Sequence, residues 1–250
     1  MTLVEASLLT PGPNVDAPVG GIEARWLGRV GYEAAHALQK RLVTARANRE
    51  IPDQLLLLEH PPVLTLGRHS DPSHILATPD ELERRGIVVH RVERGGEVTY
   101  HGPGQLVAYP ILAIADRGLL LRPLVRALET ALAQTCAALE VDAARRDGHP
   151  GCWCDPDGHA PRKIGALGLR VERGVTYHGI ALNVSVALAD FDLIDPCGMP
   201  GVASTSIDAE RAEPGATLPP PSTASVERAA RAFAPAFAAA IGANLAWPEA

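Results

Sequence analysis

The stretch RKIGALGLRVERGVTYHGIALNVS, residues 162–185, decides the fold of this chain. Its two halves, Lys163–Val171 and Val175–Val186, are mostly apolar runs, as is typical of buried strands. The short polar stretch Glu172–Gly174 separates them and ends in glycine. A hairpin is the simplest structure for two such runs, so we expect a pair of antiparallel strands here.

Further strands are expected on the N-terminal side of this hairpin. Each is a short, largely apolar or alternating run bounded by Gly, Pro or polar residues. The expected strands are Gln54–Glu59, Val63–Leu66, Ile87–Val92, Glu97–Tyr100 and Gln105–Tyr109.

Three amphipathic helices are predicted, because apolar residues recur at intervals of three and four. The first covers Tyr32–Arg46 and the second includes Leu124–Leu139. The third covers residues 223–245 near the C-terminus. Pro235 lies inside the third helix, and this predicts a kink.

The order of these elements indicates a single α+β domain with a mixed, mostly antiparallel sheet flanked by helices. Residues 1–21 carry Pro and Gly without periodicity and are expected to form a loosely ordered arm. We expect residues 22–250 to form one domain, in which residues 209–222 are a surface linker before the C-terminal helix.

The composition argues against several classes of protein. The formal net charge is -6 and the pI is about 5.8, so the chain lacks the clustered cations that nucleic-acid binding requires. No stretch approaches the ~20 apolar residues of a membrane span. The N-terminus also lacks the basic start and apolar run of a secretory signal. The four cysteines are too unevenly placed for a disulfide framework, which indicates a reducing cytoplasm.

A second informative segment is RGGEVTYHGPGQLVAYPIL, residues 94–112, which combines paired glycines with His101. Glycine allows backbone amides to approach a ligand closely, because no side chain blocks them. The segment therefore suits the lining of an extended ligand. The alternative is a pair of tight hairpin turns in which His101 only caps a loop.

Lys163 opens the first strand of the hairpin, and the chain contains only one other lysine, Lys40. Arginine supplies the remaining cationic side chains. A lysine in such a chain indicates a site that requires an amine able to lose its proton, which a guanidinium cannot do. The alternative is an ordinary solvated strand end.

The third segment is IDPCGMPG, residues 194–201, in which Cys197 lies in a loop bearing Gly and Pro. A loop cysteine is a better candidate nucleophile than Cys136, which lies on an apolar helix face. A cysteine thiol has a reference pKa of about 8.5 and needs a neighbouring base or cation to react. Lys163 is a candidate for that neighbour.

Cys152 and Cys154, with His149 and His159, form a compact group that could hold zinc. The single residue between the cysteines departs from the usual ligand spacing, so no metal site is expected. The chain also lacks a Walker phosphate loop, a Gly-x-Ser-x-Gly elbow and a His-Glu-x-x-His helix. No cofactor is therefore expected.

In order and spacing, the three segments resemble the octanoyltransferases of lipoate biosynthesis, also called lipoyl(octanoyl) transferases. The resemblance runs from about Leu55 to Ile207 and includes Leu-Thr-Leu-Gly-Arg at residues 64–68. It implies the fold of the biotin and lipoate protein ligase catalytic domain, with neither metal nor nucleotide. The chain departs from the family in Cys-Trp-Cys at residues 152–154 and in its proline-bearing tail.

The resemblance also implies roles for individual residues and partners. Cys197 would be the nucleophile, and Lys163 or His101 the base. The donor would be octanoyl-acyl carrier protein, and the acceptors the lipoyl domains of 2-oxoacid dehydrogenases and the glycine cleavage H protein. The implied acyl pocket is lined by Arg94, Gly95, Gly96, Glu97, Val98, Thr99, Tyr100, His101, Ala166, Leu167, Gly168, Gly179, Ile180 and Ala181.

Three other functions stay open from sequence alone. An ATP-dependent lipoate or biotin ligase on the same scaffold would activate a free acid as its adenylate and would need no acyl-cysteine. A non-catalytic module would bind the acyl carrier protein without becoming acylated. A cysteine hydrolase would differ only in giving the acyl group to water.

Overall fold

The computed structural model describes residues 20–68, 70–195, 202–213 and 215–247. Within these residues the main sheet has nine strands. They are β1 (Gly21–Arg29), β2 (Asp53–Glu59), β6 (Gln105–Ile111), β7 (Ala144–Arg146), β8 (His149–Cys154), β9 (Arg162–Glu172), β10 (Val175–Asn183), β11 (Ala203–Ser204) and β12 (Asn244–Ala246). The strand order is β12-β1-β2-β6-β10-β9-β8-β7, with β11 beside β9.

The pairing in this sheet is mixed and mostly antiparallel, which confirms the expected fold class. β1 runs parallel to β2 and β12, and β11 runs parallel to β9. The pairs from β2 through β6, β10, β9 and β8 to β7 are antiparallel. The hairpin prediction is also confirmed, since β9 and β10 pair from Glu172 opposite Val175 to Gly165 opposite Leu182.

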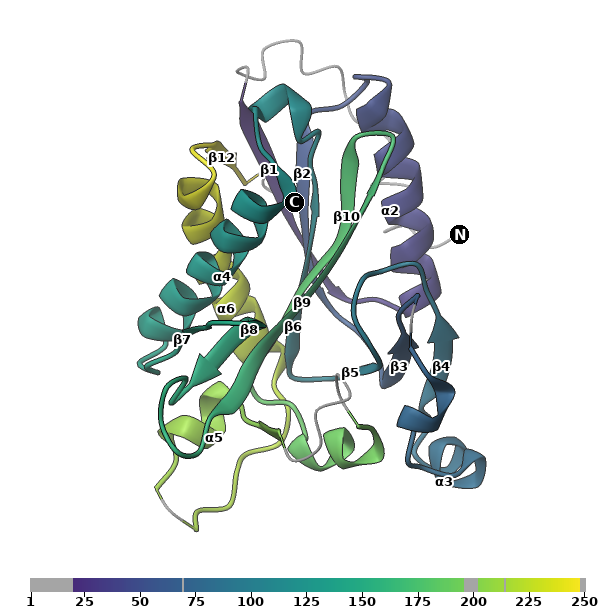
Figure 1. Cartoon of the computed structure of the whole chain (residues 1–250), viewed down its shortest axis with the longest axis vertical. Coiled ribbons are helices and arrows are strands. Elements are labelled where there is room, and N and C mark those ends of the chain that lie inside the picture. The colour runs from purple at the N-terminus through teal and green to yellow at the C-terminus, as the bar shows by residue number, and fades with distance from the viewer. Residues whose placement is uncertain (1–19, 69, 196–201, 214, 248–250) are drawn as a thin grey trace.

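A second, three-stranded sheet packs beside one end of the main sheet (Figure 1). It contains β3 (Val63–Leu66), β4 (Val88–Arg91) and β5 (Thr99–His101), and α3 (Pro79–Arg84) lies between β3 and β4 in the chain. Residues 92–98, called the 92–98 loop below, connect β4 to β5. This loop reaches the main sheet, because the Gly95 amide donates to the Leu169 carbonyl of β9 at 3.3 Å.

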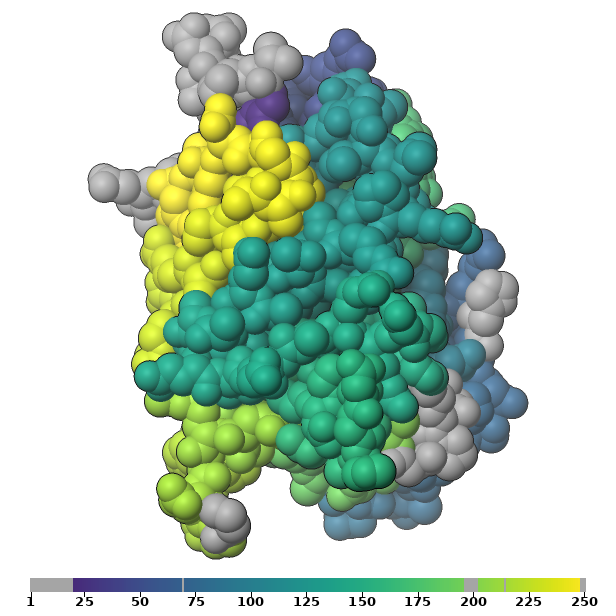
Figure 2. All heavy atoms as spheres, turned by 60° about the vertical axis from the view of Figure 1, so that its left-hand side comes forward, coloured from purple at the N-terminus to yellow at the C-terminus, as the bar shows by residue number. Residues whose placement is uncertain are grey.

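Helices cover both faces of the main sheet (Figure 1). α4 (Leu121–Ala138) and α6 (Thr223–Ala240) lie side by side on one face, as Figure 2 also shows. α2 (Tyr32–Ala47) covers β6 and β10 on the other face. The largest buried cluster lies under α4 and α6 and is built from Leu, Ala, Ile and Val side chains with two Phe and three Cys. The apolar stripes predicted for all three helices therefore face the sheet.

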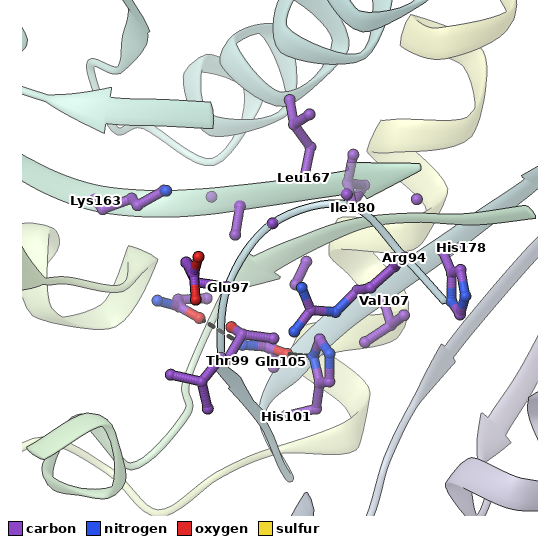
Figure 3. A pocket seen from close by; sticks show the side chains of 18 of the residues that line it. Arg94, Glu97, Thr99, His101, Gln105, Val107, Lys163, Leu167, His178 and Ile180 are labelled. Carbon is purple, nitrogen blue, oxygen red and sulfur yellow. Dashed lines mark hydrogen bonds between the residues drawn. The ribbon is translucent and has the colours of Figure 1, made fainter. Parts of the chain in front are cut away.

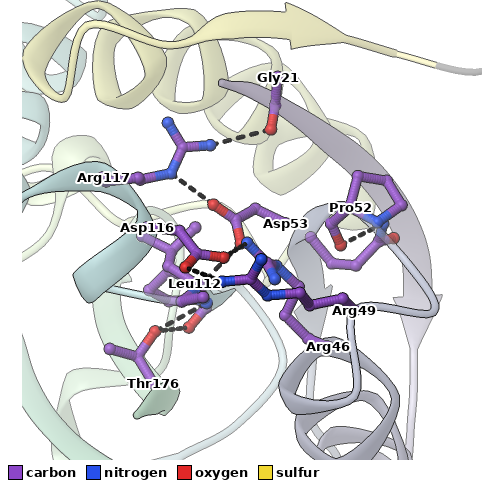
Figure 4. Close-up of polar contacts among 12 residues, drawn as sticks. Gly21, Arg46, Arg49, Pro52, Asp53, Leu112, Asp116, Arg117 and Thr176 are labelled. Carbon is purple, nitrogen blue, oxygen red and sulfur yellow. Dashed lines mark hydrogen bonds and ion pairs between the residues drawn. The ribbon is translucent and has the colours of Figure 1, made fainter. Parts of the chain in front are cut away.

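A buried ionic cluster fixes the edge of the molecule remote from β5 (Figure 4). Asp53, at the start of β2, accepts from Arg46 of α2 at 2.5 Å and also pairs with Arg117. The Ala113 amide donates to the same carboxylate at 3.0 Å, and Arg117 donates to the Gly21 carbonyl at 2.9 Å. The side chains of Asp53, Arg46 and Arg117 are 3%, 11% and 8% exposed, so their charges must be compensated locally, and Arg46 also pairs with Asp116 at 3.0 Å.

Several sequence-based boundaries need correction. The strands β1, β7, β8 and β12 were not predicted. The linker expected at 209–222 begins inside a short helix, α5 (Ile207–Arg211). The helix expected at 223–245 ends at Ala240, so α6 covers Thr223–Ala240; Pro235 lies inside it, and the kink expected there stays a prediction. Of the arm expected at 1–21, residues 1–19 lie outside the described residues, and Gly21 begins β1.

None of the helices in the described parts of the chain has the length and apolar character required to cross a membrane.

Candidate active site

A cavity lies between the β9–β10 hairpin, β6 and the 92–98 loop with β5 (Figure 3). Its walls therefore come from both sheets. Apolar atoms form most of the surface, and a few polar side chains project into it. The lining residues are Tyr32, Arg94, Gly96, Glu97, Val98, Thr99, His101, Gln105, Val107, Tyr109, Lys163, Gly165, Ala166, Leu167, Gly168, His178, Gly179, Ile180, Ala181, Asn183, Phe191, Val202 and Ser204.

Small residues on the hairpin make room for the cavity. Ala166 pairs with Ala181 across β9 and β10, and Gly168 pairs with Gly179. A Cβ at Gly168 would lie 2.8 Å from the Gly95 carbonyl oxygen, so glycine is required for the 92–98 loop to approach the strand. Side chains alternate across a strand, and Leu167, between these positions, points away from the cavity centre in Figure 3.

Arg94 holds the 92–98 loop against the small sheet. Its guanidinium donates to the Thr65 carbonyl at 2.6 Å and to the Thr65 hydroxyl at 2.8 Å and 3.1 Å. It also donates to the Gly95 carbonyl at 3.0 Å. Although Arg94 is only 8% exposed, it lines the cavity, so a fixed positive charge lies beside the ligand space.

Lys163 lies at one side of the cavity and His178 at the other (Figure 3). The Lys163 ammonium lies 5.2 Å from the centre of the Trp153 ring, a distance typical of a cation–π contact. Lys163 is opposite Trp153 of β8 and opposite Ser204 of β11. Three strands therefore fix the backbone that carries this amine.

A buried chain of hydrogen bonds connects His101 to the backbone of Lys163. His101 Nδ1 lies 2.7 Å from Gln105 Oε1, and Gln105 Nε2 donates to Asn183 Oδ1 at 2.9 Å. The Asn183 amide donates to the Thr205 carbonyl at 2.8 Å, and the Thr205 amide donates to the Lys163 carbonyl at 3.0 Å. This series of hydrogen bonds connects β5 of the small sheet to β9 of the main sheet across the floor of the cavity.

The imidazole of His101 is neutral at physiological pH. Burial, then the neighbouring His60 and the positive charge of Arg94, lower the pKa of His101 to about 3, although its bond to Gln105 opposes this shift. Because the Gln105 oxygen can only accept, Nδ1 of His101 carries the proton. A group with so low a pKa is a weak base at neutral pH, and this disfavours His101 as a general base.

Cys197 lies outside the described residues, so its role as nucleophile stays a prediction. The described residues on either side of it have defined positions. On one side, the Asp195 amide donates to the His74 carbonyl at 2.8 Å. On the other, Val202 and Ser204 line the same cavity as Lys163. Val202, the first described residue after Cys197, therefore lies at the wall of this cavity.

The other three cysteines are fully buried free thiols in the core under α4. A hydrogen bond with Cys152 and burial raise the pKa of Cys136 far above its usual range. Burial raises the pKa of Cys154 to about 12. Cys136 is thus a core residue, as predicted. Among the described residues, the group whose ligand atoms lie close enough together to hold a metal ion does not include Cys152 or Cys154.

The implied pocket residues surround this cavity, with two exceptions. Gly95 and Tyr100 are not part of the lining, since Tyr100 is buried in the small core and its hydroxyl donates to Asp190 at 2.8 Å. Sequence reasoning missed several lining residues that alternate along β6, lie on β10 or come from α2. They are Tyr32, Gln105, Val107, Tyr109, His178 and Asn183, besides Gly165, Phe191, Val202 and Ser204.

Comparison with known proteins decides the family. The lipoyl protein ligase A/B catalytic domain family matches residues 31–234. The octanoyltransferase of Acidobacterium capsulatum is 44% identical over 232 residues, which cover 89% of this chain and 91% of the relative. The chain belongs to the octanoyltransferase family. The octanoyltransferase of Chloroflexus aggregans is 45% identical over 195 residues, 77% of this chain and 87% of that protein. The chain is accordingly an acyltransferase of protein lipoylation.

Solved structures support the fold of the family. A putative lipoate protein ligase from T. acidophilum has a TM-score of 0.62 at 13% identity and covers 91% of this chain and 88% of its own. A lipoate-protein ligase A bound with ATP has a TM-score of 0.62 at 14% identity, and the match covers 92% of this chain and 88% of that protein. At such low identity these likenesses establish the architecture only.

Proposed function

We propose that this octanoyltransferase takes its acyl group from octanoyl-acyl carrier protein and holds it as a thioester on Cys197. It then transfers the group to a lysine of a lipoyl domain. The proposed acceptors are the lipoyl domains of 2-oxoacid dehydrogenases and the glycine cleavage H protein. We further propose that residues 22–250 form the catalytic domain and that the reaction takes place in the cytoplasm, where free thiols such as the three buried ones persist.

The observation that carries the proposal is one cavity that combines an apolar wall of small residues with an amine at one side. Small residues leave space along the hairpin at Ala166 and Gly168 of β9 and at Ala181 of β10. Lys163 lies near the start of β9. Each buried methylene of an acyl chain contributes about 0.8 kcal/mol, so such a cavity favours an octanoyl group over a short acyl group. This geometry supports acyl binding with the reactive carbonyl toward Lys163.

Cys197 is favoured as nucleophile for two reasons. It lies seven positions before Ser204, which is opposite Lys163 in the β9–β11 pair, so a short chain segment connects it to the amine. The three alternative thiols are buried in the core, and the raised pKa values of Cys136 and Cys154 keep those two protonated at neutral pH.

The first half-reaction forms the acyl-enzyme. The Lys163 amine takes the proton of the Cys197 thiol, and the thiolate attacks the thioester carbonyl of the donor. The bond between the acyl carbon and the carrier sulfur breaks. The carrier thiolate leaves with the proton that Lys163 had accepted, so Lys163 returns to its starting state.

The second half-reaction forms the amide. A lysine side chain has a reference pKa of about 10.4 and must reach the site unprotonated to attack the acyl-Cys197 carbonyl. Lys163 accepts the proton that the attacking nitrogen loses and returns it to the Cys197 thiolate as it leaves. Since the donor is already a thioester, no nucleotide is consumed.

His101 has a positioning role in this scheme. Its neutral ring and its bonded Gln105–Asn183 partners connect the small sheet to the strand of Lys163. We therefore assign base function to Lys163 and assign to His101 the support of the cavity floor.

Transfer of octanoyl to a lipoyl domain, measured without ATP, tests the proposal. We expect Cys197→Ser and Lys163→Ala to lose transfer, whereas Cys136→Ser and Lys40→Ala retain it. Lys40 is the matched control because it is the only other lysine and forms an ion pair with Glu172 outside the cavity. Loss of activity in the control lysine variant, with retention in Lys163→Ala, would contradict the assignment.

The same assay, run in parallel with free octanoate and ATP in place of the carrier donor, separates the alternatives. An ATP-dependent ligase would give Cys197→Ala protein the ability to use free octanoate and ATP. A non-catalytic module would bind the carrier without acylation, and a hydrolase would release free octanoate in place of the lipoyl-domain amide. Any one of these three outcomes would contradict the proposed transfer and favour the corresponding alternative.

A further inference from the structure

Three side chains with metal-binding atoms converge between α2, the 92–98 loop and β10. His36 of α2 and His178 of β10 each direct Nε2 toward the carboxylate of Glu93. The distances to Glu93 Oε2 are 3.2 Å from His36 and 4.0 Å from His178. All three ligand atoms lie within 4.8 Å of one another.

Unpartnered polar atoms surround this point. His178 is only 2% exposed, and its Nε2 has no hydrogen-bond partner in the described structure. The same is true of His36 Nε2, which approaches Glu93 without hydrogen-bond geometry. Tyr32 and Gln39, both from α2, add an unpartnered hydroxyl and an unpartnered amide nitrogen. Buried polar atoms are rarely left unpaired, so several in one place indicate a missing ligand.

The backbone also holds His178 in an unusual way. Its φ is +55°, in the left-handed region, although it lies within β10. The His178 amide donates to Gln39 Oε1 at 2.7 Å, which fixes this conformation against α2. Strained backbone of this kind persists where surrounding contacts determine it and clusters at binding sites.

The charge of Glu93 suits a cation. Its carboxylate lies at the point toward which Nε2 of both imidazoles is directed, so it supplies the negative charge that a bound cation requires. Imidazole nitrogens are common ligands of divalent transition metals.

We propose that His36, Glu93 and His178 form a binding site for one divalent transition-metal ion of the Zn²⁺ class. Two nitrogens and one carboxylate are a common ligand set for Zn²⁺. Tetrahedral ligands at about 2.0–2.1 Å from Zn²⁺ lie roughly 3.3 Å apart, so the cluster needs only a small contraction. Glu93 is 43% exposed and belongs to a loop, so it is free to make that movement.

The site has a consequence for the cavity. Glu93 precedes Arg94 in the 92–98 loop, and His178 lines the cavity on the side away from Lys163 (Figure 3). A bound ion would therefore fasten the loop to α2 and to β10. It would restrain the cavity wall without contacting the end where acyl transfer is proposed.

Titration of the full chain with ZnCl₂, followed by calorimetry, tests the proposal. The protein is first treated with a chelator, and Cys197→Ser is used as the background so that this thiol does not bind the ion. We expect one Zn²⁺ per chain. We also expect His36→Ala and Glu93→Gln to weaken binding by more than about 100-fold, the upper range seen for outer-shell changes. His36 and Glu93 are partly exposed, so these variants preserve the fold, which circular dichroism checks.

His90→Ala is the matched control, because its ring stacks on Tyr32 at 5.3 Å but is not part of the cluster. Its Zn²⁺ affinity should equal that of the background. CoCl₂ in place of ZnCl₂ should give visible bands without the sulfur-to-cobalt charge transfer of a thiolate site. Absence of stoichiometric binding, binding that survives both ligand variants, or a thiolate band would each overturn the proposal.

Discussion

Replacing Ala181 with leucine tests whether the hairpin wall determines the acyl-chain length. Ala181 pairs with Ala166, and both line the cavity. Ala166 is three residues along β9 from Lys163, about 10 Å in an extended strand. The seven carbon–carbon bonds of an octanoyl group reach roughly 9 Å when extended. A leucine at position 181 would therefore occupy the space of the terminal carbons.

The size of the effect follows from the displaced carbons. Leucine adds three carbon atoms to the alanine side chain and excludes about three methylene groups from the cavity. At about 0.8 kcal/mol for each methylene, the loss is about 2.4 kcal/mol, or about 60-fold in kcat/KM for an octanoyl donor. A butyryl donor does not reach this point and should lose less than about 3-fold.

The assay is kcat/KM for transfer from butyryl, hexanoyl and octanoyl carrier protein to a lipoyl domain. Ala137→Leu is the control, since Ala137 is exposed on α4. The control should keep the chain-length preference of the wild type. A uniform loss with all three donors, or an unchanged octanoyl rate in Ala181→Leu, would refute the reasoning.

Three further predictions concern stability. Gly168→Ala places Cβ 2.8 Å from the Gly95 carbonyl oxygen and should lower the free energy of unfolding by about 1–3 kcal/mol. Gly31→Ala, which has open space around it, should not, and equal thermal midpoints for the two variants would contradict this. Asp53→Asn leaves Arg117 without a carboxylate partner among the described residues, whereas Arg46 keeps Asp116. It should lower the free energy of unfolding in urea by about 3 kcal/mol at unchanged kcat/KM, and an unchanged urea midpoint would count against the ionic cluster. The pKa of His178 is lowered from 6.5 to about 3, so below pH 6.5 the unfolded chain binds more protons than the folded chain, and the free energy of unfolding falls toward pH 3 by up to about 1.4 kcal/mol per pH unit from this group. His178→Asn, measured by urea unfolding with chelator present, should have a shallower slope, and an equal slope would exclude His178 as its source.

The strongest sequence patterns were those of buried strands and amphipathic helices. The β9–β10 hairpin was predictable because its two apolar runs flank a short turn, and β3 matches the predicted Val63–Leu66 at both ends. β1 was missed although Ile22 and Ala24 alternate with Glu23 and Arg25, which is the pattern of a half-buried strand. The strands β7 and β12 have only three residues each, too few for any periodicity to be recognised.

The site residues likewise fall into those that a sequence motif could identify and those that it could not. Ala166, Gly168 and Lys163 belong to one continuous segment, so a motif in the sequence could identify them together. His36, Glu93 and His178 come from three separate segments, and no spacing in the sequence relates them. Only the packing of α2 and the 92–98 loop on β10 brings them together.

The chemistry of the acyl-enzyme is tested most directly by intact-mass and peptide mass spectrometry after mixing the chain with octanoyl-acyl carrier protein and no acceptor. The account predicts one octanoyl group per chain, on the peptide that contains Cys197, present in Lys40→Ala and absent from Cys197→Ser. It also predicts release of the group when a lipoyl domain is added. An octanoyl group on Cys136, or one that remains in Cys197→Ser, would contradict the account.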